Sequence, residues 1–182
     1  MTPSADITVD GDVVTKLHSP GTDPAALAVR LQIALQRLPA DAPAVIHRAA
    51  ATLPPPAWDA APPGRPIALA HGDFHLGQLG RRPDGPWQLI DIDDLGLGDP
   101  AWDLARPAGL WAAGLIPDAD WQSFLDGYRA GRGPALPSGG DPWPVLDPLA
   151  RAEVVYSAAV GAHRDADESQ DELLAACARM AA

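Results

Sequence analysis

The chain has 182 residues, of which 47% are hydrophobic, and its formal net charge is −11. This length and apolar content exclude a disordered tail and fit one domain with a core of its own. The acidic balance argues against nucleic-acid binding, because proteins that bind phosphate backbones cluster Lys and Arg.

The single cysteine, Cys177, excludes an internal disulfide and a cysteine-based zinc cage, and its alanine-rich context predicts an inert packing role. Residues 1–12 lack the basic start and apolar run of a signal peptide. No stretch reaches the ~20 apolar residues of a membrane span. We therefore expect a cytoplasmic protein that binds neither membrane nor nucleic acid.

The first 60 residues predict a hairpin, two helices and a linker. The hairpin is indicated by alternating apolar and polar residues around the turn signal Asp10-Gly11. Apolar residues at helical spacing indicate the two helices, and a proline-rich stretch indicates an extended connector. The ranges are 6–17 for the hairpin, 24–38 and 42–53 for the helices, and 54–66 for the connector, the best internal boundary.

The remaining residues, 61–182, predict short strands followed by helices. IALA reads as a short buried strand, and a loop with two glycines follows it. A second hairpin turns at Pro83-Asp84-Gly85. The ranges are 67–70 for the strand, 71–78 for the loop and 79–90 for the hairpin, with helices from Pro100, over 119–130, from Asp147-Pro148 and over 167–181. Aromatic residues at helical spacing should form core.

Two motifs carry chemistry: HGDFHLGQ at 71–78 and LIDIDDLGLGDPAWDLA at 89–105. Carboxylates between apolar residues are costly unless they are paired, hydrogen-bonded or metal-bound. Asp73 can accept a proton from a hydroxyl, and Gln78 offers an amide oxygen. Asp91 ends a strand and should project beside the loop. A carboxylate with an amide oxygen suits Mg²⁺, which leaves room for substrate phosphates.

These segments resemble the aminoglycoside phosphotransferase and choline kinase superfamily, whose signature reads HGDxHxGN, then a strand with IDW or IDF, then GDPxxDLA. The resemblance is specific over 67–106. It implies an α+β, protein-kinase-like phosphotransferase fold with a mainly helical C-terminal lobe. It also implies transfer of the ATP γ-phosphoryl group, with Mg²⁺, to a hydroxyl of an aminoglycoside-, amino alcohol- or sugar-like small molecule.

The same resemblance implies roles for the residues of the loop and the strand end. Asp73 would be the catalytic base, and His71 would orient its loop. Gln78 and Asp91 would bind the metal. The superfamily usually has Asn at the position of Gln78, and Gln keeps the amide oxygen while adding a methylene. Asp93 would lie near the metal and tune it.

Two further aspartates, Asp99 and Asp103, would brace the loop by hydrogen-bonding backbone groups, Asp103 from a helix. The nucleotide half is short, because only 70 residues precede His71 and none forms a glycine-rich loop. Lys16 fits the strand that carries the phosphate lysine, but the helix that should present a glutamate to it has no acid after Asp23. We expect a reduced N-terminal lobe and linker over 1–60 and a catalytic C-terminal lobe over 61–182.

Three explanations of this short half stay open. The chain could be an active kinase with a minimal lobe, or a pseudokinase or truncated member that binds a small molecule or a protein. A second copy or a partner chain could also complete the nucleotide site. Outside the superfamily, His71, Asp73 and His75 alternate as in a metal hydrolase, but further zinc ligands are lacking downstream. Helix caps and turns explain Asp84 and Asp99 but not the other aspartates together.

Overall fold

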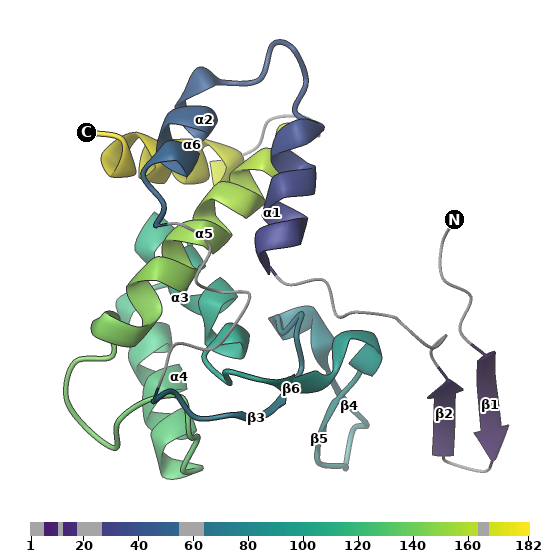
Figure 1. Ribbon diagram of the computed structural model, residues 1–182. Helices are drawn as coiled ribbons and strands as arrows, with labels where there is room; N and C mark the ends of the chain where they lie inside the picture. Colours follow the sequence, from purple (N-terminus) through teal and green to yellow (C-terminus); the bar gives the residue numbers. More distant parts are fainter. Residues whose placement is uncertain (1–5, 11–12, 18–26, 55–63, 164–167) are drawn as a thin grey trace.

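The computed structural model describes residues 6–10, 13–17, 27–54, 64–163 and 168–182. This part of the chain is α+β and mainly helical, with small antiparallel sheets (Figure 1). The helices are α1 (Leu27–Gln36), α2 (Ala44–Ala51), α3 (Trp102–Ala113), α4 (Asp118–Ala130), α5 (Trp143–Gly161) and α6 (Glu168–Met180). The strands are β1 (Asp6–Asp10), β2 (Val13–Leu17), β3 (Ala68–Ala70), β4 (Leu79–Arg81), β5 (Trp87–Leu89) and β6 (Gly96–Gly98).

The predicted N-terminal hairpin is confirmed by β1 and β2, which pair antiparallel from Asp6 opposite Leu17 to Asp10 opposite Val13. Its predicted turn lies outside the described residues. In Figure 1 this hairpin stands apart from the helical body, to the right of β4 and β5. Of the helix predicted over 24–38, the structure describes the part from Leu27, which forms α1.

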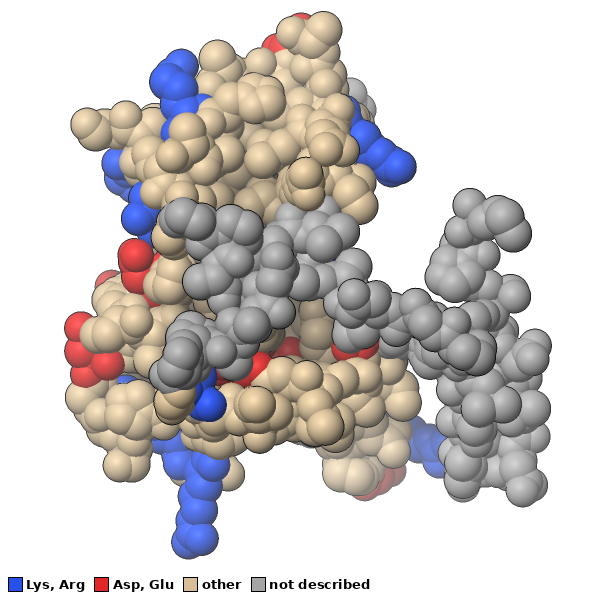
Figure 2. Space-filling view, viewed as in Figure 1, with Lys and Arg blue, Asp and Glu red and all other residues tan. Residues whose placement is uncertain are grey.

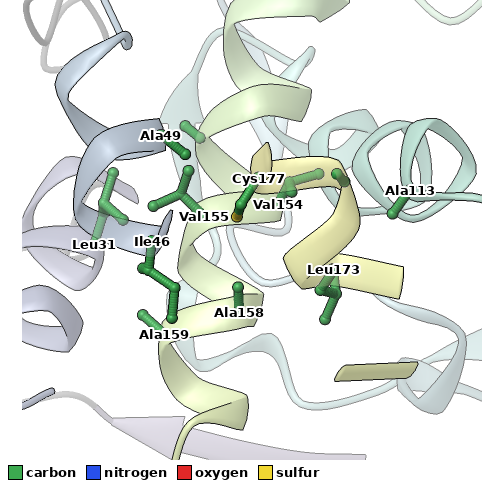
Figure 3. Close-up of a cluster of buried hydrophobic side chains, with 12 residues drawn as sticks. Leu31, Ile46, Ala49, Ala113, Val154, Val155, Ala158, Ala159, Leu173 and Cys177 are labelled. Carbon is green, nitrogen blue, oxygen red and sulfur yellow. The ribbon is translucent and has the colours of Figure 1, made fainter. Parts of the chain in front are cut away.

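The first hydrophobic core joins α1 and α2 to α5 and α6. Ile46 of α2, Val155 and Ala158 of α5 and Cys177 of α6 are all fully buried in it. Figure 3 shows these side chains facing one another, with small residues where the helices come close. Cys177 packs in this core, as expected, and burial raises the pKa of its thiol to about 11.

A second core joins α3, α4 and the first half of α5. Leu104, Leu125 and Leu146 are buried in it, and the ring of Trp121 stacks on that of Trp111 with centroids 5.5 Å apart. The aromatic residues at helical spacing therefore are core residues, as predicted. Because α5 belongs to both cores, it is the central support of the helical body (Figure 1).

Two predictions about these elements are wrong. The helix expected from Asp147 begins four residues earlier at Trp143, where the Asp141 side chain accepts the first backbone N–H, and Pro148 lies inside it. The strand at 67–70 is not buried: Ile67 is 70% and Leu69 63% exposed. The reason is that β3 pairs with β6, a strand the sequence did not indicate, and nothing among the described residues covers that face.

No described helix combines the length and the apolar character that crossing a bilayer requires.

Candidate active site

The loop between β3 and β4 carries the first motif and is held close to the second one. Gly72 has φ of +85°, and a Cβ placed there would lie 2.4 Å from the backbone oxygen of Asp94. Both the backbone angle and the close approach require glycine at this position. The loop therefore touches the segment that follows Asp91, although the two are some twenty residues apart in sequence.

Asp103 holds this loop from the first turn of α3. Its carboxylate accepts the backbone N–H of His71 at 2.8 Å and that of Gly72 at 3.0 Å. Two backbone donors on one carboxylate fix both the position and the tilt of the peptide that precedes Asp73. A helix N-terminus also favours an acidic residue, so Asp103 suits its place on α3.

His71 connects the same loop to the strand end at Asp91. The ring is 2% exposed, and its Nε2 lies 2.9 Å from the carbonyl oxygen of Ile90, to which it donates. The Ile90 N–H in turn donates to the carbonyl of Gln78 at 2.9 Å, extending the pairing of β4 with β5. Strand pairing and His71 thus position the peptide bond that leads into Asp91.

Gln78 and Asp91 meet at this point. The side-chain amide of Gln78 donates to Asp91 Oδ2 at 3.0 Å, and Gln78 is buried. Asp91 has left-handed backbone angles, φ 58° and ψ 56°, which are uncommon outside glycine and cluster at functional sites. The pair leaves the amide oxygen of Gln78 and the second carboxylate oxygen of Asp91 free of this bond. Amide and carboxylate oxygens are ligand types that Mg²⁺ accepts, together with substrate phosphates.

The described residues contain no group of three or more His, Cys, Asp or Glu side chains that could hold a metal ion. The pair of Gln78 and Asp91 contributes one carboxylate and one amide. No described contact joins Asp73 directly to Gln78 or Asp91, so the structure brings together two of the three predicted groups and places the third on the braced loop.

Asp73 itself contacts two arginines. Its Oδ1 lies 3.2 Å from Arg30 of α1 and 3.6 Å from Arg106 of α3, and its side chain is 38% exposed. Arg30 also donates to Asp94, and Arg106 donates to Glu153 at 3.0 Å. Acidic and basic groups therefore alternate across the site. Both described arginine contacts use Oδ1, and Oδ2 of Asp73 makes neither of them.

Glu153 is the buried end of this chain of charges. It is 6% exposed on α5, and burial raises its pKa, while the adjacent Arg106 acts in the opposite direction. A narrow cleft of about 20 Å³ lies beside it. In Figure 2, acidic side chains are visible along the hollow that crosses the molecule. The cleft is lined by Arg30, Gly72, Asp73, Phe74, Trp102, Ala105, Arg106, Glu153 and Tyr156.

Asp99 braces the other end of the second motif. Its carboxylate accepts two bonds from Arg65, at 2.7 and 2.8 Å, and a third from the backbone of Ala101. Arg65 also donates to the carbonyl of Ala135, and its hydrogen bond to Asp99 raises its pKa. Asp99 and Arg65 together therefore connect the residues before β3 to the start of α3 and to the loop after α4. None of the described bonds of Asp99 goes to the His71 loop that it was predicted to brace, and the backbone donors of that loop bond Asp103.

Two of the predicted site residues lie outside what the structure describes at side-chain level. Lys16 belongs to β2 and Asp93 to a short 3₁₀ turn, but only their backbones are described. Their predicted roles therefore stay predictions.

Sequence reasoning missed three charged residues of the cleft, Arg30, Arg106 and Glu153. Each had a signal. Arg30 is the only charged residue of α1. Arg106 follows Asp103 by three residues, so both lie on one side of α3. Glu153 is the one acid in the apolar stretch from Ala152 to Val155.

Comparison with known proteins gives one match. The model of the phosphotransferase enzyme family (APH) matches residues 7–149, most of the chain, including both motifs and the β1–β2 hairpin. No curated protein and no solved structure gives a significant match.

Proposed function

The chain belongs to the phosphotransferase enzyme family, and from this premise we propose that it transfers the γ-phosphoryl group of ATP to a hydroxyl of a small molecule. A single observation supports the proposal most: Gln78 and Asp91 meet at 3.0 Å beside the loop that Asp103 fixes. Asp91 also adopts a left-handed backbone at this point, a conformation that clusters at functional sites. The family implies a protein-kinase-like fold, in which α3 to α6 would belong to the C-terminal lobe.

Asp73 would act as the base. The acceptor hydroxyl oxygen forms a bond to the γ-phosphorus, and the bond from that phosphorus to the β–γ bridging oxygen breaks, leaving its electron pair on ADP. The hydroxyl proton passes to the Asp73 carboxylate, whose Oδ2 makes neither of the arginine contacts. The hydrogen bonds from His71 and Gly72 to Asp103 keep the loop, and with it Asp73, in one orientation.

Gln78 and Asp91 would hold Mg²⁺ through the amide oxygen and the carboxylate. The bound metal supplies positive charge that offsets the negative charge of the phosphates, the main source of acceleration in this chemistry. In this structure the amide nitrogen of Gln78 faces Asp91, so metal binding would turn the amide oxygen toward the carboxylate side. Lys16 would contact the nucleotide phosphates from β2.

The acceptor would bind at the cleft beside Asp73, which measures about 20 Å³ in the ligand-free chain and would have to widen to hold it. Aromatic side chains of Phe74, Trp102 and Tyr156 line it together with Glu153. Aromatic faces attract cationic groups, which supports an aminoglycoside or an amino alcohol, while Arg30 and Arg106 of the same cleft balance the charges of Asp73 and Glu153. The acceptor class remains part of the proposal.

The experiment is an assay of ADP formation by the purified chain with Mg·ATP and a panel of aminoglycosides, amino alcohols and sugars. Asp73→Asn should lower kcat by about 10²–10⁴-fold, the usual contribution of a general base. Asp84→Asn is the matched control, because Asp84 is an exposed turn residue between β4 and β5.

Equal activity of Asp73→Asn and Asp84→Asn would overturn the assignment of the base. The non-catalytic alternative has one observation in its favour, since two arginines neutralise Asp73 in the ligand-free chain. It would be supported by a wild-type chain that binds an acceptor of the panel and forms no ADP.

A further inference from the structure

Arg30 is the one charged residue of α1, and it points into the site. Its guanidinium contacts Asp73 Oδ1 at 3.2 Å through Nη1 and donates to Asp94 through Nη2. The side chain is only 21% exposed, so this placement is defined by the surrounding residues. One guanidinium therefore bridges the proposed base and the segment that follows the proposed metal ligand Asp91.

This bridge borders the space in which the transferred group would lie. A phosphoryl group in transit has to sit between the acceptor oxygen at Asp73 and the metal at Gln78 and Asp91. Asp94 follows Asp91 by three residues, and its backbone oxygen lies against Gly72. A cation that contacts Asp73 and Asp94 together is thus on the border of that space.

The two arginines at Asp73 differ in freedom. Arg106 is held by Glu153 through Nε at 3.0 Å and reaches Asp73 only at 3.6 Å. The described ion-pair partners of Arg30 are the carboxylates of Asp73 and Asp94. Both carboxylates are more exposed than that of Glu153. Arg30 can therefore exchange a carboxylate for a phosphoryl group, whose oxygens match the planar donor fork of a guanidinium equally well.

We propose that Arg30 contacts the γ-phosphoryl group during transfer and supplies positive charge from α1. This inference rests on the proposed function. In the ligand-free chain Arg30 balances Asp73 and Asp94; with substrate present, one of its N–H donors moves from Asp73 to a non-bridging γ-oxygen. The move also frees Asp73 to receive the hydroxyl proton. The atoms exchanged in the transfer are unchanged, because Arg30 keeps its own proton throughout.

The sequence of α1 agrees with this role. The helix contains no acidic residue that could pair with a phosphate-contacting lysine, and Lys16 is the only lysine of the chain. A phosphate site in this chain therefore depends on arginine for further positive charge. Arg30 is the only described residue that α1 offers for it.

The test compares two nucleotides that differ in the γ group. Binding of Mg·ADP and of Mg·AMP-PNP is measured by calorimetry for wild type, Arg30→Gln and Arg30→Lys. Arg37→Gln is the matched control, since Arg37 is exposed one residue beyond α1 and its loss removes the same charge. Melting temperatures check that each variant is folded.

Arg30→Gln should weaken Mg·AMP-PNP by about 10- to 100-fold, the range for a hydrogen bond to a charged group, and change Mg·ADP by less than twofold. Its kcat should fall by about 10³-fold or more, the smallest effect usual for a phosphoryl-contacting arginine. Arg30→Lys should recover part of the Mg·AMP-PNP affinity and part of kcat, and Arg37→Gln should match wild type.

Equal weakening of both nucleotides would make Arg30 a structural residue. A raised kcat would make it an inhibitory residue, and an unchanged kcat would mean that it takes no part in the transfer. Each of these results overturns the inference. A folded wild type that binds neither nucleotide would overturn the proposed function itself. A wild type that is active while Arg30→Gln is unaltered would overturn this inference alone.

Discussion

The helical body and the strand layer, which we define as residues 67–98, are built on opposite principles. The body buries its apolar residues almost completely, as in Leu104 and Val155. All but one of the large apolar side chains exposed within the described residues lie between Ile67 and Leu97. The strand layer is instead held by polar contacts, those of His71, Asp99 and Asp103.

This difference separates stability from chemistry. Hydrophobic burial is large but non-directional, so it suits a body that has to persist. Hydrogen bonds to charged groups are smaller in net effect but directional, so they suit a loop whose carboxylate must face one way. The proposed catalytic groups therefore lie on the part of the chain with the least apolar burial.

The largest expected effect on stability comes from truncating a buried apolar side chain of the helical body. Leu146→Ala should lower the free energy of unfolding by about 2–5 kcal/mol, because Leu146 is fully buried and its loss leaves a cavity. Leu97→Ala should change it by less than about 0.5 kcal/mol, since Leu97 is 80% exposed. Urea unfolding measures both. A cost for Leu97→Ala as large as that for Leu146→Ala would mean that the strand layer is covered in solution.

The next effect concerns the polar side. Asp103→Ala leaves the N–H groups of His71 and Gly72 without their acceptor and should cost about 2 kcal/mol of stability. Activity should fall further, by about 10²-fold, because the loop with Asp73 loses its orientation. Asp120→Ala is the control, as Asp120 is an exposed acid in the first turn of α4. Matching results for the two variants, by urea unfolding and ADP formation, would contradict the bracing role.

The smallest expected effect on stability comes from replacing Glu153, which lies where the two regions meet. Its pKa is raised by burial, so the folded chain holds that proton more tightly than the unfolded one. Stability from this group is present at low pH and is lost as pH rises from the ordinary value of 4.5 through the raised pKa. Glu153→Gln removes this loss, and at pH 8 it should be neutral or stabilising by about 1 kcal/mol.

Melting curves of wild type and Glu153→Gln between pH 4 and pH 8 measure this. A wild type that gains stability relative to the variant as pH rises would show that Arg106 outweighs burial.

Much of the body could be predicted from sequence, because its signals are local. The helix predicted over 119–130 is α4, and the helix over 167–181 is α6, each within a residue of its bounds. Strand β6 could not be predicted, since Gly-Leu-Gly has no strand propensity and forms one only by pairing with β3. The exposure of Leu69 was missed for the same reason.

The site divides in the same way. The motifs predict Asp73, Gln78 and Asp91 as site residues, because their types and spacing fit phosphoryl transfer. The contacts of Asp73 with Arg30 and Arg106 depend on how α1 and α3 pack against the loop, and no local pattern encodes that. Sequence thus indicates the candidate groups, and packing decides which charges lie beside them.

The central claim, that Gln78 and Asp91 form a magnesium site for ATP, is tested most directly by the melting temperature with ATP, with and without Mg²⁺. Asp91→Asn is the variant of choice, because asparagine tolerates the left-handed backbone of position 91 and removes only the charge. Wild type should gain ~2.7 kcal/mol of stability at ATP a hundredfold above its dissociation constant, only with Mg²⁺, and Asp91→Asn should gain far less. Stabilisation that is independent of Mg²⁺, or that survives in Asp91→Asn, would contradict the account.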